Sequence, residues 1–104
     1  MNGIPKVVVI GAGVVGSLIA REIAKYSCQV TLIDKEEDAG WGVTKANSAI
    51  VHGGYDDPVD SVRGQFAAKG NQMYTKLSQE LGFELKRIGS YVLAFEDDEL
   101  THLD

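Results

Sequence analysis

Three glycines near the start of the chain follow the spacing Gly-x-Gly-x-x-Gly, at Gly11, Gly13 and Gly16. An apolar run leads directly into them, and a second apolar run farther along ends at Asp34. Glycine turns the chain sharply off a strand, and a residue without a Cβ lets main-chain atoms approach a pyrophosphate closely. A helix that begins here directs its free amides and the positive end of its dipole at such an anion. The pattern therefore predicts a dinucleotide-binding turn.

Asp34 indicates which dinucleotides fit this turn. It lies 18 residues after Gly16, at the carboxyl end of the second apolar run. At that place a carboxylate accepts hydrogen bonds from both hydroxyls of an adenosine ribose. The same negative charge repels a 2'-phosphate, so the sequence disfavours NADP.

The apolar pattern predicts the elements that position these residues. Residues 6–10 and 29–33 predict two strands, and helical spacing predicts a helix over residues 14–26 between them. The unbroken apolar first strand is typical of a parallel sheet covered on both faces. The fold class is therefore α/β, the N-terminal portion of a Rossmann-like fold. The helix face expected on the sheet comprises Val15, Leu18, Ile19, Ile23 and Tyr26.

A longer helix is expected in the second half of the chain. Asp57 is the predicted N-cap, Pro58 suits the first helical position, Asp60 is placed as a capping-box acid and Gly82 is the predicted C-cap. Gly70 falls on the apolar stripe of this helix, which predicts close packing against another element there. The stripe comprises Val62, Phe66, Met73, Leu77 and Leu81.

The remaining stretches are shorter and less regular. Residues 35–58 carry turn chemistry, with an apolar core at 48–52 that predicts a strand or a tight helical turn. Two short strands are expected over residues 83–88 and 90–95, and an acid-capped helix over 96–104.

A second set of residues with chemical potential lies between the second strand and the long helix. The sequence Thr-Lys-Ala-Asn-Ser-Ala-Ile-Val-His-Gly-Gly begins at Thr44 and contains His52. Its hydroxyl, amide and ammonium groups are donors suited to phosphate oxygens, and its small residues let main chain approach a flat ring. A histidine beside such a ring can bind a substrate anion, move a proton or serve a structural role.

Together with the glycine turn, this segment resembles the flavin-dependent oxidoreductases of the D-amino-acid oxidase superfamily. Within that superfamily it resembles the FAD-dependent glycerol-3-phosphate dehydrogenases of anaerobic type. Asn71, Tyr74, Leu81 and residues 86–90 also match the family pattern, so the resemblance covers nearly the whole chain.

The resemblance implies FAD as the cofactor, with the Thr44 segment along the pyrophosphate and His52 beside the flavin. It implies oxidation of glycerol 3-phosphate by hydride transfer to the flavin, and a quinone or a redox partner subunit as electron acceptor. The catalytic residues are expected elsewhere in a longer protein, with His52 as a candidate. The expected cofactor-binding residues are Gly11, Ala12, Gly13, Val14, Val15, Gly16, Asp34, Lys35, Thr44, Lys45, Asn47, Ser48 and Ala49.

Other functions stay open at this point. The family usually has Glu where this chain has Asp34, and Asp is the commoner acid in NAD sites, so an NAD-dependent enzyme is one alternative. A 2-hydroxy acid such as L-2-hydroxyglutarate, or an amino acid, is an alternative substrate. A stand-alone nucleotide-binding module without catalysis is a third interpretation.

Length and composition bound these interpretations. The 104 residues form one domain at most, with 44% hydrophobic residues, 24% charged residues and a net charge of −5. Without a basic stripe, nucleic acid is an unexpected partner, and no apolar run is long enough for a membrane span. No metal site is expected. A single cysteine excludes an intrachain disulfide, and a cytoplasmic place is expected, with the inner membrane face as the alternative.

The chain is short for the fold it predicts. We expect residues 1–104 to be the N-terminal part of an FAD-binding domain, with the substrate domain absent and the chain alone inactive. A small protein that completes its sheet by dimerising is the alternative. In either case an unpaired sheet edge favours self-association.

Overall fold

The computed structural model describes residues 3–103, and the chain forms two compact units, Met1–Ile50 and Val51–Asp104. The first unit contains β1 (Lys6–Ile10), α1 (Val14–Ile23), β2 (Gln29–Ile33) and the short 3-10 helix η1 (Gly42–Thr44). The second contains α2 (Val62–Leu81) and the 3-10 helix η2 (Glu99–His102). The α/β class is thereby confirmed, and each unit is described by itself below.

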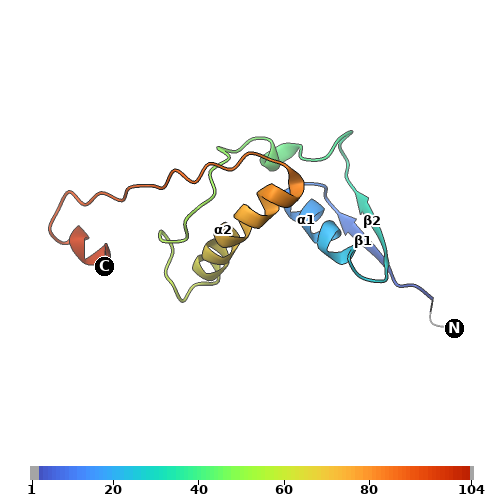
Figure 1. Cartoon of the computed structure of the whole chain (residues 1–104), viewed down its shortest axis with the longest axis horizontal. Helices are drawn as coiled ribbons and strands as arrows, with labels where there is room; N and C mark the ends of the chain where they lie inside the picture. The colour runs from blue at the N-terminus through green and yellow to red at the C-terminus, as the bar shows by residue number, and fades with distance from the viewer. Residues whose placement is uncertain (1–2, 104) are drawn as a thin grey trace. The chain divides into compact units, whose positions relative to one another are not determined.

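The first unit is a parallel βαβ unit. β1 and β2 pair in parallel from Lys6 opposite Gln29 to Ile10 opposite Ile33, and α1 connects them (Figure 1). Both strands have the predicted bounds. A parallel pair needs a crossover, and the ten-residue helix supplies it.

Close packing of α1 on the strands depends on Gly16. A Cβ at this position would lie 1.8 Å from the main-chain oxygen of Gly11 and 3.6 Å from the side chain of Val9. The lack of a side chain at Gly16 therefore allows the helix to lie this close to the strand and the turn. Ala20, one turn later, is buried on the same face.

The predicted apolar face of this helix is partly wrong. Val15 and Ile19 are exposed, and Tyr26 is 74% exposed because it lies beyond the end of the helix. α1 ends at Ile23 rather than at residue 26. The reason is a tightened last turn, in which the amides of Lys25 and Tyr26 donate to carbonyls three residues back.

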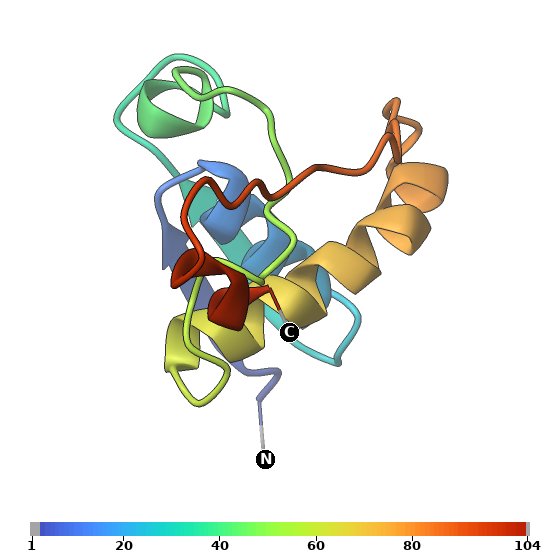
Figure 2. The ribbon, with the colours of Figure 1, turned by 90° about the vertical axis from the view of Figure 1, so that its left-hand side faces the viewer.

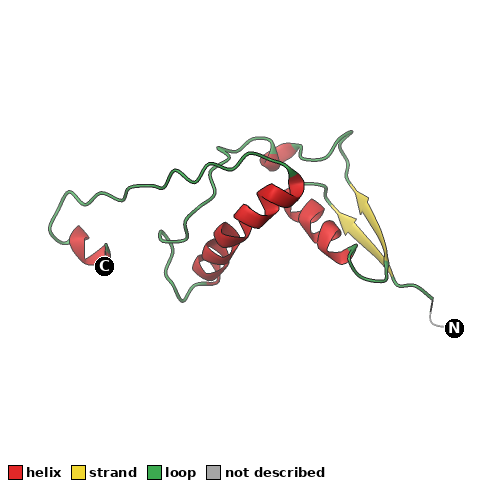
Figure 3. Ribbon diagram, in the orientation of Figure 1, coloured by secondary structure: helices red, strands yellow, loops and turns green. Residues whose placement is uncertain are grey.

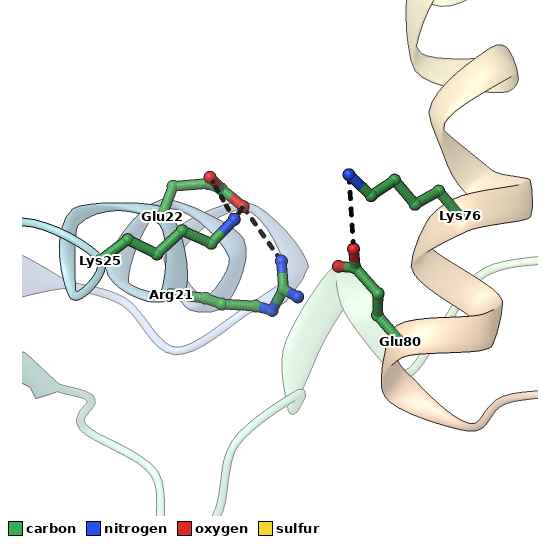
Figure 4. A network of polar contacts seen from close by, with 5 residues as sticks. All are labelled: Arg21, Glu22, Lys25, Lys76 and Glu80. Atoms are coloured by element: carbon green, nitrogen blue, oxygen red, sulfur yellow. Dashed lines mark hydrogen bonds and ion pairs between the residues drawn. The ribbon is translucent and has the colours of Figure 1, made fainter.

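Charged side chains form ion pairs at the surfaces of both helices. Glu22 of α1 pairs with Arg21 at 3.0 Å and with Lys25, just beyond the end of the helix, at 2.6 Å (Figure 4). On α2, Lys76 pairs with Glu80 at 3.6 Å, in the i, i+4 arrangement that supports an isolated helix. Pairs this exposed contribute little to folding stability.

Only one face of the two-stranded sheet is covered within the described chain. Exposure alternates along β1, and Ile10 is 83% exposed while Val7 and Val9 are partly buried. The expectation of a strand covered on both faces is not met by the described residues. The second face of the sheet, which includes Val8 and Ile10, is apolar and exposed.

The second unit is built around α2, a helix of 20 residues (Figure 2). Ser61, not Asp57, is its N-cap: the Ser61 hydroxyl accepts from the Gly64 amide at 2.9 Å and donates to the Pro58 carbonyl at 2.7 Å. Asp57 pairs with Arg63 instead, at 3.1 Å. The predicted start was wrong because a turn from Pro58 to Ser61 precedes the helix and offers a second, better-placed cap.

The C-terminal end of α2 is as predicted. Gly82 adopts φ 72°, in the left-handed region, and its amide donates to the Ser78 carbonyl. Beyond it the described chain contains no strand over residues 83–95, and 48–52 is likewise neither strand nor helix (Figure 3). The expected terminal helix is reduced to η2, and Asp104 lies outside the described residues.

α2 makes its contacts through small and polar residues rather than through its apolar stripe. Phe66 is 69% exposed, and Val62 and Met73 are exposed as well. Gly64 is the close-packed glycine, whereas a Cβ on Gly70 would meet nothing within 4 Å. The packing role predicted for Gly70 is therefore wrong. We call the opposite stripe the contact face of α2, formed by Gly64, Ala68, Asn71 and Thr75.

None of the described helices is both long and apolar enough to cross a membrane.

Candidate functional site

The glycine turn joins the ends of both strands. Gly11 adopts φ 103°, a conformation that side-chain-bearing residues rarely take, and its amide donates to the Ile33 carbonyl at 2.7 Å. The turn therefore leaves β1 directly beside the carboxyl end of β2. Ligands of parallel α/β sheets bind at this end of the strands.

The N-terminus of α1 has main-chain donors that find no acceptor among the described residues. Its N-cap is Gly13, which has no side chain to cap the first turn. The amides of Val14, Val15 and Gly16 lack acceptors within the helix. Thr44 Oγ1 accepts from the Val14 amide at 3.0 Å, which leaves the Val15 and Gly16 amides for an anion. A helix N-terminus with such amides is suited to a diphosphate.

Asp34 is locked to the turn by main-chain donors. Its Oδ2 accepts from the Ala12 amide at 2.5 Å and its Oδ1 from the Glu36 amide at 2.9 Å. The Glu36 amide, and next the Ala12 amide, hold the pKa of the Asp34 carboxyl below its ordinary value. The carboxylate is thus charged at neutral pH. Each oxygen keeps a further lone pair with which to accept a ribose hydroxyl.

The segment after β2 returns to the glycine turn. The Gly40 amide donates to the Ala12 carbonyl at 2.9 Å, and a Cβ on Gly13 would lie 3.0 Å from Thr44 Oγ1. Thr44 and Gly13 thus lie together, as expected if both line one binding site. The sequence analysis did not predict that Thr44 caps the start of α1. The glycine at the N-cap position could have indicated that another residue must accept from the first amides.

Other predicted donors of this segment are engaged with the loop itself. Asn47 donates to the Thr44 carbonyl and accepts from the Ala49 amide at 2.7 Å, and Ala49 adopts φ 55°. The Lys45 ammonium lies 3.8 Å from the ring centroid of Trp41. Trp41 itself is 50% exposed.

The two remaining candidates on this side are exposed. Lys35 lies 3.4 Å from the Glu36 carboxylate and Ser48 is exposed on the loop. Their roles toward a cofactor stay predictions.

His52 belongs to the second unit. Its carbonyl accepts from the Asn71 side-chain amide at 3.0 Å, and its side chain is exposed. Among the described residues no side chain or main-chain group hydrogen-bonds its imidazole. The main chain of His52 is therefore held by Asn71, while its imidazole is exposed.

Comparison with protein families decides the class. The sequence model of the family "FAD dependent oxidoreductase" (DAO) matches residues 6–104. The chain belongs to this family.

Individual relatives carry several names. A glycerol 3-phosphate dehydrogenase of Caloramator mitchellensis is 54% identical over 97 residues, covering 93% of this chain and 20% of the relative. An L-2-hydroxyglutarate dehydrogenase of Arabidopsis thaliana is 34% identical over 97 residues, with the same two coverages. A glycerol 3-phosphate oxidase of Mycoplasma genitalium is 27% identical over 99 residues, covering 94% of this chain and 26% of the relative. The chain thus spans about a fifth to a quarter of the length of these curated relatives.

The residues of the first unit fit the family's cofactor, FAD. The left-handed turn at Gly11, the helix start at Gly13, which has no capping side chain of its own, and the charged Asp34 are the features that a dinucleotide needs at a strand end. A Cβ at Gly13 would crowd Thr44, so the space at the helix start depends on glycine.

Proposed function

We propose that this chain is the N-terminal part of a Rossmann-type FAD-binding domain, and that the protein containing it oxidises glycerol 3-phosphate by hydride transfer to FAD. The observation that supports glycerol 3-phosphate as the substrate is the 54% identity to a glycerol 3-phosphate dehydrogenase over 93% of the chain. The substrate domain is proposed to lie in other parts of that protein.

The first unit supplies binding and orientation in this proposal. The free amides of Val15 and Gly16 receive the pyrophosphate, and Gly13 keeps the approach open. Asp34 accepts hydrogen bonds from the adenosine ribose. When bound, FAD supplies the two-electron acceptor, and the chain's residues hold it in place.

The loop of residues 40–49 has an orienting role. Thr44 joins this loop to the helix start through the Val14 amide, at 3.0 Å. Lys45, Asn47 and Ser48 then lie beside the phosphates, and Ala49 lies beside the flavin ring. Lys45 is proposed to leave the Trp41 ring and offer its charge to the pyrophosphate when the cofactor is bound.

A spectrum of the purified full-length protein tests the proposal. We expect a yellow protein whose visible flavin absorption bleaches on anaerobic addition of glycerol 3-phosphate. A protein that neither carries nor takes up FAD would overturn the cofactor assignment and favour an NAD enzyme or a nucleotide-binding module.

A 2-hydroxy acid is the second candidate substrate. It is favoured by the 34% identity to an L-2-hydroxyglutarate dehydrogenase over 93% of the chain. The same anaerobic experiment separates the two candidates. Bleaching by L-2-hydroxyglutarate but not by glycerol 3-phosphate would transfer the assignment.

The physiological context is also proposed. The reduced flavin passes its electrons to a quinone or to a redox partner subunit, and the protein works in the cytoplasm or at the inner face of the membrane. Activity with a soluble quinone analogue, and its absence with other acceptors, is the expected result.

A further inference from the structure

The turn of residues 52–55 is hydrogen-bonded to two other segments of the second unit. From α2, the Asn71 side chain donates to the His52 carbonyl at 3.0 Å. From the segment after α2, the Ser90 hydroxyl contacts the Tyr55 hydroxyl at 2.9 Å. The His52 carbonyl on one side of the two glycines and the Tyr55 side chain on the other are thus tied to other elements.

The glycines between these ties allow the close approach. Gly54 adopts φ 90°, and a Cβ there would lie 2.7 Å from the Ala68 amide nitrogen of α2. A Cβ on Gly53 would lie 2.5 Å from the Tyr55 ring. Ala68 and Asn71 are three residues apart on the contact face, so the turn is seated on one side of α2.

Arg87 holds the Asn71 side chain in place. Its guanidinium donates to Asn71 Oδ1 at 2.5 Å and to the Asn71 carbonyl at 2.6 Å. It also donates twice to Thr75 Oγ1, at 3.2 and 2.9 Å. A planar, rigid fork with these four contacts fixes which end of the Asn71 amide faces His52, because its oxygen is already occupied.

The exposed imidazole of His52 takes its direction from this anchored main chain. We propose that Arg87 is a positioning residue: through Asn71 it fixes the His52 main chain and thereby the direction in which the imidazole is presented. The effect of Arg87 on flavin reduction rests on the proposed function. The anchoring of the His52 main chain by Arg87 and Asn71 does not depend on it.

Two variants and a matched control test the inference in the full-length protein. Arg87→Met removes the guanidinium and keeps an unbranched apolar stem. Asn71→Leu removes the amide with little change of volume. We call the contacts that join Arg87, Asn71 and the His52 carbonyl the clamp. Lys86→Met is the control, because it removes a neighbouring charge that contacts Glu84 at 3.3 Å, outside the clamp. FAD content and thermal unfolding establish that each variant is folded.

The first measurement is hydrogen exchange of the peptide that spans residues 50–56. Both clamp variants should exchange faster there, whereas Lys86→Met should match the parent protein. Unchanged exchange in folded Arg87→Met would overturn the clamp, whatever the protein's substrate is.

The second measurement is the single-turnover rate of flavin reduction as a function of pH. We expect Arg87→Met to lower this rate about tenfold to a hundredfold, with KM little changed. In a His52→Gln background the same substitution should have almost no further effect, because the two residues act as one unit. Additive losses would show that Arg87 does not act through His52.

The two measurements separate failure of the inference from failure of the proposed function. A protein that no tested substrate reduces would contradict the proposed function, while the exchange result would still decide on the clamp. Faster exchange with an unchanged reduction rate would overturn the positioning role alone.

Discussion

At the residue scale, main-chain donors decide the chemistry of the candidate cofactor site. Asp34 accepts from the amides of Ala12 and Glu36, and Thr44 accepts from the amide of Val14. These contacts join the end of β2, the glycine turn and the loop of residues 40–49. Because the donors are main-chain groups, the direction of the Asp34 carboxylate depends on the fold of the turn.

Substitution of Asp34 is expected to weaken FAD binding. In the full-length protein, Asp34→Asn keeps the shape but loses the charge-assisted hydrogen bonds to the ribose. The affinity for FAD should fall about tenfold to a hundredfold. Titration of the apoprotein with FAD measures this. Asp38→Asn, an acid of the same loop that accepts from its neighbour Ala39, is the matched control and should bind FAD normally.

The lowered pKa of Asp34 also predicts a pH dependence of stability. Because the carboxyl pKa is depressed in the folded protein, its stabilising contribution is complete above the ordinary value of 3.8 and is lost as pH falls through the lower folded value. The midpoint of thermal unfolding should therefore fall less steeply below this pH in Asp34→Asn than in the parent protein. Parallel curves would contradict the assigned hydrogen bonds.

Gly13 offers a steric test of the same site. Gly13→Val places a branched side chain where a Cβ alone lies 3.0 Å from Thr44 Oγ1. We expect loss of FAD binding of about a hundredfold or more, since both the helix start and the approach of the pyrophosphate are obstructed. Equilibrium titration with FAD is the measurement. Normal binding by a folded Gly13→Val protein would refute the assignment of the glycine turn.

At the scale of elements, the predicted bounds of β1 and β2, the start of α1 and the C-cap of α2 agree with the structure, whereas the end of α1, the start of α2 and the segments after residue 82 were predicted wrongly. The strands were predictable because their apolar residues and the glycine turn agree. The start of α2 was not, because Asp57 and Ser61 are both good caps and only the turn from Pro58 decides between them. Residues 83–95 have strand-like composition, but among the described residues no strand pairs with them.

The candidate site was predictable to a similar degree. The glycine spacing and Asp34 identified the turn, whereas the contact between Thr44 and the helix start depends on how the loop folds back. The grip of Arg87 on Asn71 joins residues 16 positions apart across a loop, and no local pattern predicts it.

Two glycines of α2 are expected to respond oppositely to alanine. A Cβ on Gly64 would lie 2.5 Å from the Pro58 carbonyl oxygen, so Gly64→Ala should destabilise the protein by about 1–3 kcal/mol. A Cβ on Gly70 meets nothing within 4 Å, so Gly70→Ala should stabilise by up to about 1 kcal/mol through helix propensity. Denaturant unfolding of the two variants gives the signs. Equal effects at both positions would contradict the described contacts of α2.

At the scale of the whole chain, burial is sparse. Among the described residues the buried apolar side chains are Ala12 and Ala20, while Ile10 of β1 and Phe66 of α2 are largely exposed. Each unit thus presents apolar surface that its own residues leave open. The curated relatives, of which the chain covers about a fifth to a quarter, are long enough to include segments that cover such faces.

The isolated 104-residue chain is therefore expected to bind FAD weakly and to self-associate. Within residues 3–103 its two-stranded sheet has unpaired edges and one exposed apolar face, and both favour contacts between copies. Sedimentation over a range of concentrations should show association, and titration should show FAD affinity far below that of the full-length protein. Ile10→Lys, which places a charge on the uncovered face, should reduce the association, because a charged group resists burial between copies. A monomer that binds one FAD tightly would instead mean that the first unit forms a complete cofactor site by itself.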